Sequence, residues 1–108
     1  MPNYLNKTSG AIAANDTSVT LAWRETSPGF VAVQLAGTFS GTITFEATVD
    51  GANWVSINGM PVASTTPAST ATAAGIWYIT ANGVTAVRAR STTWASGSLT
   101  ATLVGMAN

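Results

Sequence analysis

The sequence of 108 residues contains no cysteine and no histidine. Without cysteine the chain can form no disulfide, iron–sulfur cluster, thiolate zinc site or thiol nucleophile. Without histidine it lacks the commonest general base and the commonest metal ligand. We therefore expect a protein that is not an enzyme, with no catalytic residue, no metal and no cofactor.

Charge is scarce as well. Charged side chains make up 7% of the residues, and four basic side chains balance four acidic ones, so that the net charge is zero. Electrostatic binding to nucleic acid or to an anionic membrane has little to act on in such a chain. No apolar run approaches the roughly 20 residues that span a bilayer, and the N-terminus lacks the pattern of a secretory signal. We expect no nucleic-acid partner, no membrane partner, and folding in a cytoplasm.

Small and hydroxylated residues replace the missing charges. Alanine, threonine, serine and glycine fill more than half of the chain. A nearly neutral surface provides little repulsion between molecules and favours association. The composition therefore indicates a protein whose normal state is assembled.

Apolar residues alternate with polar ones along most of the length. In residues 42–49, Ile43, Phe45, Ala47 and Val49 point one way and the residues between them point the other way. Turn residues recur about every ten positions, which is typical of a β-sandwich or barrel. The predicted strands are Ser18–Arg24, Phe30–Gly37, residues 42–49, Asn53–Ile57, Gly75–Ala81, Val84–Ser91 and Ser98–Gly105.

These strands predict an all-β fold: a single antiparallel β-sandwich, immunoglobulin-like or jelly-roll-like, over residues 17–108. Residues 1–16 lack a strand pattern and are predicted to form an extended N-terminal arm, either a clamp that orders on binding or an unattached tail. Residues 58–72 contain Pro61 and Pro67 and are predicted to be a long connection, either a contact loop or a disordered one.

Two groups of charged residues have a chemical interpretation beside a structural one. Glu46 and Asp50 are four strand positions apart, roughly 13 Å, which is too far for either class of glycosidase carboxylate pair. Arg88 and Arg90 lie two positions apart and hence on one face of a strand. They either pair across strands with Glu46 or Glu25, or dock acidic groups of a neighbouring subunit.

The aromatic residues favour a core over a sugar-binding platform. Trp23 and Trp54 fall on predicted core strands, whereas Trp94 stands alone in a polar turn and is predicted to be the most exposed aromatic. In the segment Gly75–Ala81, Trp77 and Ile79 share one face and the other face is apolar too. Such a strand is either central or covered by a partner.

Three pieces of the chain resemble, in this order, small all-β proteins of tailed bacteriophage particles. They are VQLAGTFSGTITFEATVDGANWVSI (33–57), TAAGIWYITANGVTAVRARST (72–92) and SGSLTATL (96–103), and the segment from Val33 to Leu103 that contains them is about two-thirds of the chain. In phage particles such domains are carried by head decoration (cement) proteins and by tail or baseplate components.

The resemblance implies a structural virion protein, and we expect a decoration protein that binds the outer surface of a capsid and stabilises it. Its expected partners are the major capsid protein and itself, as a homotrimer, on a particle assembled in the host cytoplasm. The alternative is a glycan- or receptor-binding module of a tail or baseplate. The candidate interface residues are Tyr4, Leu5, Met60, Val62, Arg88, Arg90 and Trp94.

Overall fold

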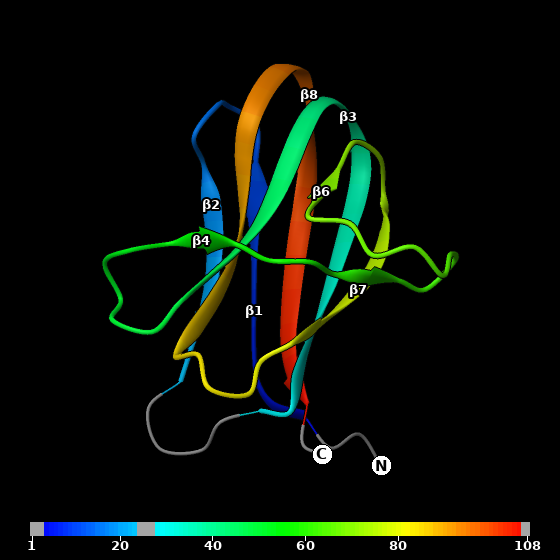
Figure 1. Ribbon diagram of the computed structural model, residues 1–108. Helices are drawn as coiled ribbons and strands as arrows, with labels where there is room; N and C mark the ends of the chain where they lie inside the picture. The colour runs from blue at the N-terminus through cyan, green and yellow to red at the C-terminus, as the bar shows by residue number, and fades with distance from the viewer. Residues whose placement is uncertain (1–3, 24–27, 107–108) are drawn as a thin grey trace.

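The regular structure of the chain consists of antiparallel strands joined in one sheet (Figure 1). The computed structural model describes residues 4–23 and 28–106, with only the backbone described for Tyr4 and Leu5. These residues contain no helix, so the predicted all-β fold is confirmed. The strands are β1 (Tyr4–Ile12), β2 (Ser18–Ala22), β3 (Phe30–Thr48), β4 (Val55–Ser56), β5 (Met60–Pro61), β6 (Thr70–Ala71), β7 (Gly75–Thr80) and β8 (Ala86–Met106).

Two long strands, β3 and β8, pair with each other along nearly their whole lengths. Both bend near the middle and form the arch at the top of Figure 1. The first half of β3 and the second half of β8 lie in one layer with β1, β7 and β5. The other halves lie in a second layer with β2, β4 and β6. The predicted sandwich is thus made by a single hydrogen-bonded sheet that folds over on itself.

Glycines at the bend let the two long strands remain continuous. The sequence pattern predicts separate strands on either side of residues 38–41 and 92–97, but the pairing runs through both segments with register shifts. Gly37 and Gly97 have φ angles of 133° and 93°, which side chains rarely adopt. A Cβ on Gly97 would collide with the carbonyl oxygen of Thr38, so the backbones approach more closely there than another residue would allow.

The core lies between the two layers and consists of the inward faces of their strands. Alternation directs these side chains inward, because successive residues of a strand point to opposite faces. Phe45 of the second layer meets Trp77 of the first, with ring centroids 5.4 Å apart. The largest buried apolar side chains are Ile12, Val19, Leu21, Val31, Val33, Leu35, Ile43, Phe45, Trp77, Ile79, Val87, Leu99 and Leu103.

The N-terminal segment is part of the sheet. Tyr4–Ile12 forms β1 and pairs with β8 from Met106 to Leu99, and Ile12 is fully buried in the core. The prediction of an extended arm over residues 1–16 is therefore wrong for β1, and residues 1–3 lie outside the described residues. The cause is that β8 offers a free edge: pairing satisfies the backbone of β1 although its own sequence has only a weak apolar pattern.

The predicted connection over residues 58–72 is also more regular than expected. It contains β5 and β6, and Gly59 and Ala68 form an isolated bridge with each other. Ala71 of β6 is buried against the core. This segment therefore packs along β3 and β7, and its exposed apolar residues are held in defined positions.

Candidate interaction surfaces

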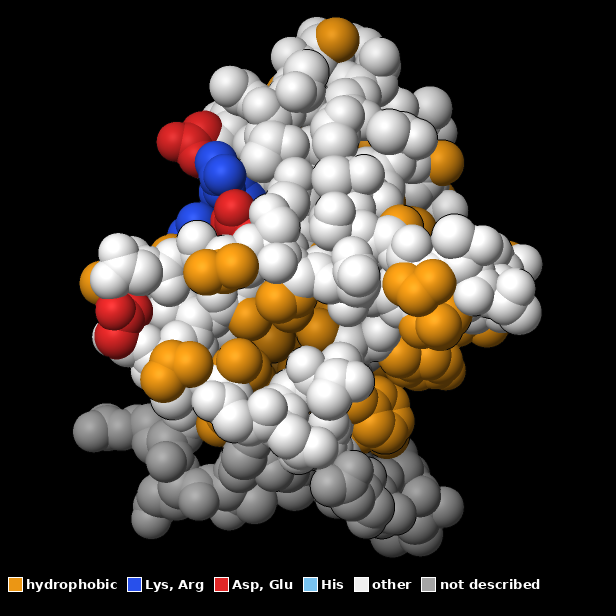
Figure 2. Space-filling model, viewed as in Figure 1, with side chains coloured by type: hydrophobic (Ala, Val, Ile, Leu, Met, Phe, Trp, Pro, Cys, Tyr) orange, Lys and Arg blue, Asp and Glu red, His pale blue; other side chains and the backbone are white. Residues whose placement is uncertain are grey.

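An apolar surface covers the outward side of the first layer. We call it the outer apolar face and define it by Phe30, Ala32, Met60, Ile76, Tyr78 and Met106. In Figure 2 orange side chains gather at the right of the molecule and also near its centre, and much of the remaining surface is white.

Strand alternation and register bring these residues together. Trp77 and Ile79 point into the core, so Ile76 and Tyr78 of β7 point out and are 40% and 45% exposed. Ala32 of β3 pairs with Tyr78 on one side, and Met60 of β5 pairs with Tyr78 on the other. The outward side of β7 is thus apolar, and the described residues leave it uncovered, in agreement with its predicted double apolar pattern.

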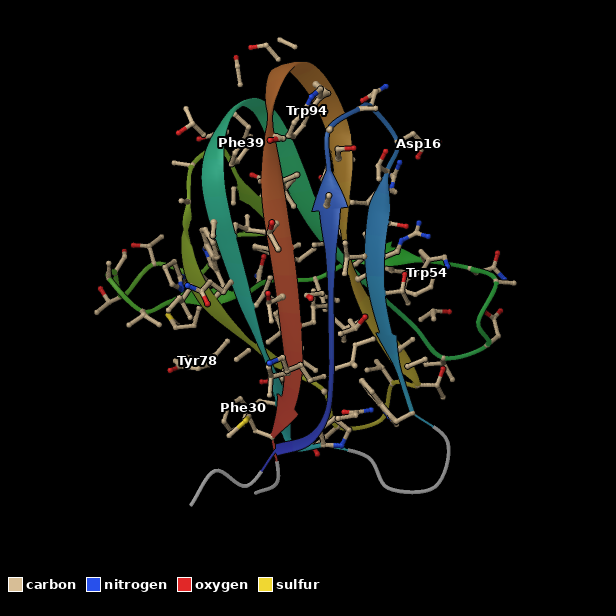
Figure 3. All side chains as sticks on the ribbon, turned by 180° about the vertical axis from the view of Figure 1, so that it is seen from behind. Asp16, Phe30, Phe39, Trp54, Tyr78 and Trp94 are labelled. Atoms are coloured by element: carbon tan, nitrogen blue, oxygen red, sulfur yellow. The ribbon has the colours of Figure 1, made fainter. Side chains whose placement is uncertain are left out.

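The aromatic pair Phe30 and Tyr78 shapes the centre of this face. Their rings meet edge to face, with centroids 5.5 Å apart and planes at 89° (Figure 3). Aromatic pairs in proteins favour this arrangement. Together with Ala32 and Met106 they line a shallow hollow of about 420 Å³. A partially exposed aromatic ring beside a shallow apolar hollow is typical of an interface anchor.

The predicted candidates Met60 and Val62 lie at or beside this face. Met60 belongs to it, and Val62 is 56% exposed at the end of β5, where its amide donates a hydrogen bond to the carbonyl oxygen of Ile76 at 3.0 Å. Tyr4 pairs with Met106 through the backbone, so the start of β1 borders the same face. The side chains of Tyr4 and Leu5 lie outside the described part of the chain.

The sequence reasoning missed Phe30 and Met106 as surface residues. A signal for Phe30 was present, because Val31, Val33 and Leu35 occupy the inward face and alternation directs Phe30 outward. The same signal extends to Met106, because Leu99, Ala101 and Leu103 occupy the inward face of β8, but its place beside Phe30 depends on the register of β8 against β3.

Trp94 does not occupy the exposed position predicted for it. It is half-buried at the bend and stacks on Phe39, with ring centroids 5.4 Å apart and planes at 2° (Figure 3). The prediction that Trp94 is the most exposed aromatic residue is wrong, because the segment predicted to be a polar turn around it is the bent middle of β8. The exposed aromatic among the described residues is Tyr78.

A cluster of charged residues lies on the outward side of the second layer. Arg88 is the register partner of Glu46 and donates a hydrogen bond from Nε to its Oε1 at 2.7 Å. Arg90 donates from Nε and Nη2 to the same carboxylate at 2.9 and 3.1 Å, and from Nη1 to Asp16 at 2.9 Å. The predicted cross-strand pairing with Glu46 is confirmed, whereas Glu25 lies outside the described residues.

The surroundings of Glu46 explain how a carboxylate can be buried to 6% exposure in this chain. The hydrogen bonds from Arg90 and then from Arg88 outweigh desolvation and lower the pKa of Glu46 below its ordinary value of 4.5. The hydrogen bonds that Arg90 donates to Glu46 and to Asp16 raise the pKa of Arg90. The guanidinium carbon of Arg88 also lies 4.1 Å from the ring centroid of Trp54, so Arg88 contacts both Glu46 and Trp54 within the chain.

Asp50 is engaged in a turn. Its Oδ1 accepts hydrogen bonds from the amides of Ala52 and Asn53, each at 2.8 Å, and these bonds lower its pKa strongly. Glu46 and Asp50 thus serve local structure separately, as the distance argument predicts. Among the described residues no group of three or more acidic side chains could hold a metal ion.

A second apolar hollow lies beside this turn. Val49, Val55 and Val84 line it together with Ile57 and Asn53, and both Val49 and Val55 are 65% exposed. It lies at the end of β3, beside β4 and the turn that precedes β8. Within residues 4–23 and 28–106, no helix exists that is long and apolar enough to cross a membrane.

No known protein family matches the chain, and no curated protein sequence matches it significantly. Solved structures do share its fold. The SPBc2 prophage-derived protein YomS is similar with a TM-score of 0.67 and 17% identity, over 92% of this chain and 92% of YomS. The PBSX exported protein XepA is similar with a TM-score of 0.72 and 16% identity, over 92% of this chain and 38% of XepA.

A putative α-L-fucosidase from Bacteroides thetaiotaomicron is similar with a TM-score of 0.50 and 16% identity, over 98% of this chain and 22% of the other. At identities this low the likeness shows a shared all-β fold and no shared activity. The chain spans nearly the full length of YomS and a minor part of the other two proteins.

Proposed function

We propose that this chain is a non-catalytic structural protein of a phage particle and that it binds other proteins through the outer apolar face. The observation that carries the proposal is the exposure of Ile76 and Tyr78 on a sheet surface next to a shallow apolar hollow. Exposed apolar patches of this kind mark interaction sites in soluble proteins. The prophage-derived YomS, which shares the fold over 92% of both chains, supports the phage context.

The chemistry of the charged side chains supports a role without catalysis. The Glu46 carboxylate is occupied by two guanidinium groups, and Asp50 holds its own turn. Glu46 and Asp50 do not line the hollow of the outer apolar face, and among the described residues that do, Tyr78 alone carries a side-chain hydroxyl group. Binding, and not proton transfer, is what this surface can do.

Within the particle, we assign the protein to the outside of the capsid as a decoration protein that binds the major capsid protein. A protein that binds only the assembled shell stabilises it by mass action, and contacts with adjacent capsid subunits add an effective concentration. A neutral surface rich in hydroxyl groups suits dense packing of many copies, because neighbouring copies do not repel one another.

Self-association, expected as a homotrimer, belongs to the same proposal. The chain has a net charge of zero, so copies approach without long-range repulsion. Light scattering of the purified protein should give a mass of three times 11.0 kDa. A mass of one chain at every concentration tested would refute self-association and leave binding to the capsid as a separate question.

The alternative is a glycan- or receptor-binding module of a tail or baseplate. The observation that favours it is the exposed ring of Tyr78, since a flat aromatic face can stack on a sugar. The lining of the hollow argues against it, because Phe30, Ala32 and Met106 offer no side-chain hydrogen bonds to sugar hydroxyls. Copy number separates the two: a decoration protein is present in hundreds of copies in each particle and a tail module in tens.

The experiment that tests the proposal measures rebinding of the protein to particles from which it has been stripped. Tyr78→Ala removes the central aromatic ring of the outer apolar face and should weaken rebinding by about 2 kcal/mol, roughly 30-fold. The matched control is Val55→Ala, which trims an exposed apolar residue of the second layer. Loss of rebinding in the control alone would refute the assignment of the face, and so would wild-type rebinding by both variants.

A further inference from the structure

Two asparagines of the chain, Asn58 and Asn82, are each followed by glycine. In an Asn-Gly dipeptide the backbone nitrogen of the glycine can approach the asparagine side chain closely, because glycine has no side chain to obstruct it. The two dipeptides have the same local chemistry. Both asparagines are exposed, and the fold differs at the glycine that follows each of them.

The first dipeptide is held on both sides. The amide of Gly59 donates a hydrogen bond to the carbonyl oxygen of Ala68 at 2.7 Å, and the amide of Ala68 returns one at 2.9 Å. Gly59 is buried, and a Cβ there would lie 3.1 Å from Trp77 and 3.4 Å from Phe45. The nitrogen of Gly59 is thus occupied by a short hydrogen bond and cannot move without disturbing the core.

The second dipeptide is open. Asn82 and Gly83 are both exposed at the turn between β7 and β8, and apart from its chain neighbours no atom of the described residues lies within 4 Å of the Cβ position of Gly83. Gly83 has a φ angle of 91°, and within the described part of the chain its amide donates to no protein group. The turn is anchored just beyond it, where the indole of Trp23 donates to the carbonyl oxygen of Val84 at 3.0 Å.

We propose that Asn82 is a site of spontaneous deamidation in the folded protein and that Asn58 is protected from the same reaction. The deprotonated backbone nitrogen of Gly83 attacks the side-chain carbonyl carbon of Asn82. A nitrogen–carbon bond forms, the bond from that carbon to the side-chain nitrogen breaks, and ammonia leaves with a proton from solvent. Water then opens the resulting five-membered imide at either carbonyl, giving aspartate or isoaspartate without any oxidation or reduction.

Deamidation makes a larger relative change to the charge of this chain than it would to that of a highly charged protein. It adds one negative charge to a sequence whose basic and acidic side chains balance at four each. That charge appears in the turn that leads to Val84, which lines the second apolar hollow with Val49 and Val55. Deamidation of Asn82 is independent of the proposed function and is tested separately.

The test is incubation of the folded, full-length protein at 37 °C in mildly alkaline buffer. Isoaspartate is quantified by enzymatic methylation with labelled S-adenosylmethionine, and fragmentation mass spectrometry locates it. Modification at residue 82 should be at least about tenfold faster than at residue 58, because residue 58 must first open locally. The rate should increase with pH, since the attacking nitrogen must lose its proton.

Two variants and one condition complete the design. Asn82→Ser should remove most of the label from the folded protein, and Asn58→Ser should leave the label at residue 82 unchanged. In denaturant both dipeptides of the wild-type chain should be modified at similar rates, because only the fold distinguishes them. Equal rates at the two sites in the folded protein would overturn the proposal, as would protection of residue 58 that persists after unfolding or a total label in Asn82→Ser as large as that of the wild type.

Discussion

Replacement of Glu46 by glutamine tests how much the charged cluster contributes to stability. Glutamine keeps the size and one carbonyl acceptor but removes the charge that faces Arg88 and Arg90. Removing one partner of a fully buried ion pair costs about 3–5 kcal/mol. The two arginine side chains are 20% and 28% exposed, so solvent screens part of the interaction and we expect a loss of about 2 kcal/mol.

Thermal unfolding converts this loss into a measurable shift. An unfolding entropy of about 2.1 cal/mol/K for each residue gives roughly 0.23 kcal/mol/K for a chain of this length, so Tm should fall by about 9 °C. The matched control is Asp16→Asn, which removes a carboxylate that is 76% exposed and binds the same Arg90. That control should change Tm by no more than about 2 °C.

The pH dependence gives an independent check on Glu46→Gln. Because folding lowers the pKa of Glu46 below 4.5, the ionised carboxylate stabilises the folded state fully at pH values above its unfolded pKa. That stabilisation is lost as the pH falls through the folded pKa. The difference between wild type and Glu46→Gln should therefore be constant from neutral pH to about 5.5 and should narrow below about 4.5. A Tm unchanged by the substitution, or a gap that widens in acid, would refute the reasoning.

Three further predictions concern the packing of the fold, measured by denaturant unfolding. Ile12→Ala should cost about 2–5 kcal/mol because this residue of β1 is fully buried, and a loss below 0.5 kcal/mol would show that β1 is not part of the core. Ser91→Ala should cost about 1–3 kcal/mol, because the buried hydroxyl donates to the carbonyl oxygen of Ala14 at 2.6 Å; an unchanged midpoint would contradict this. Gly97→Ala should cost more than Gly51→Ala, since both have positive φ angles but only Gly97 lies against another backbone; the reverse order would contradict the bend.

Several parts of the fold follow from sequence alone because they depend on neighbouring residues. Alternation in residues 42–48 and in Gly75–Ala81 predicts extended strands and states which side chains point together. Phe45, Trp77 and Ile79 accordingly lie in the core. Arg88 and Arg90 are two positions apart on a strand and therefore share a face. Glu46 is one of the two partners that the sequence predicts for them, and Arg88 pairs with it.

The tertiary structure decided what depends on partners distant in the chain. Whether Tyr4–Ile12 is an arm or a strand depended on the free edge of β8, which no local pattern reports. The half-buried position of Trp94 arose from the bend that merges two predicted strands into β8.

The outer apolar face likewise depends partly on local sequence and partly on tertiary structure. Sequence predicted that both sides of β7 are apolar, because alternation puts Ile76 and Tyr78 opposite Trp77 and Ile79, and it left open whether the strand is central or covered by a partner. Only the register of β3, β5, β7 and β8 placed Phe30, Met60 and Met106 beside Tyr78 and so made one surface from four strands. Alternation along a strand is a local property of the covalent chain, whereas the position of one strand against another depends on the packing of the whole core.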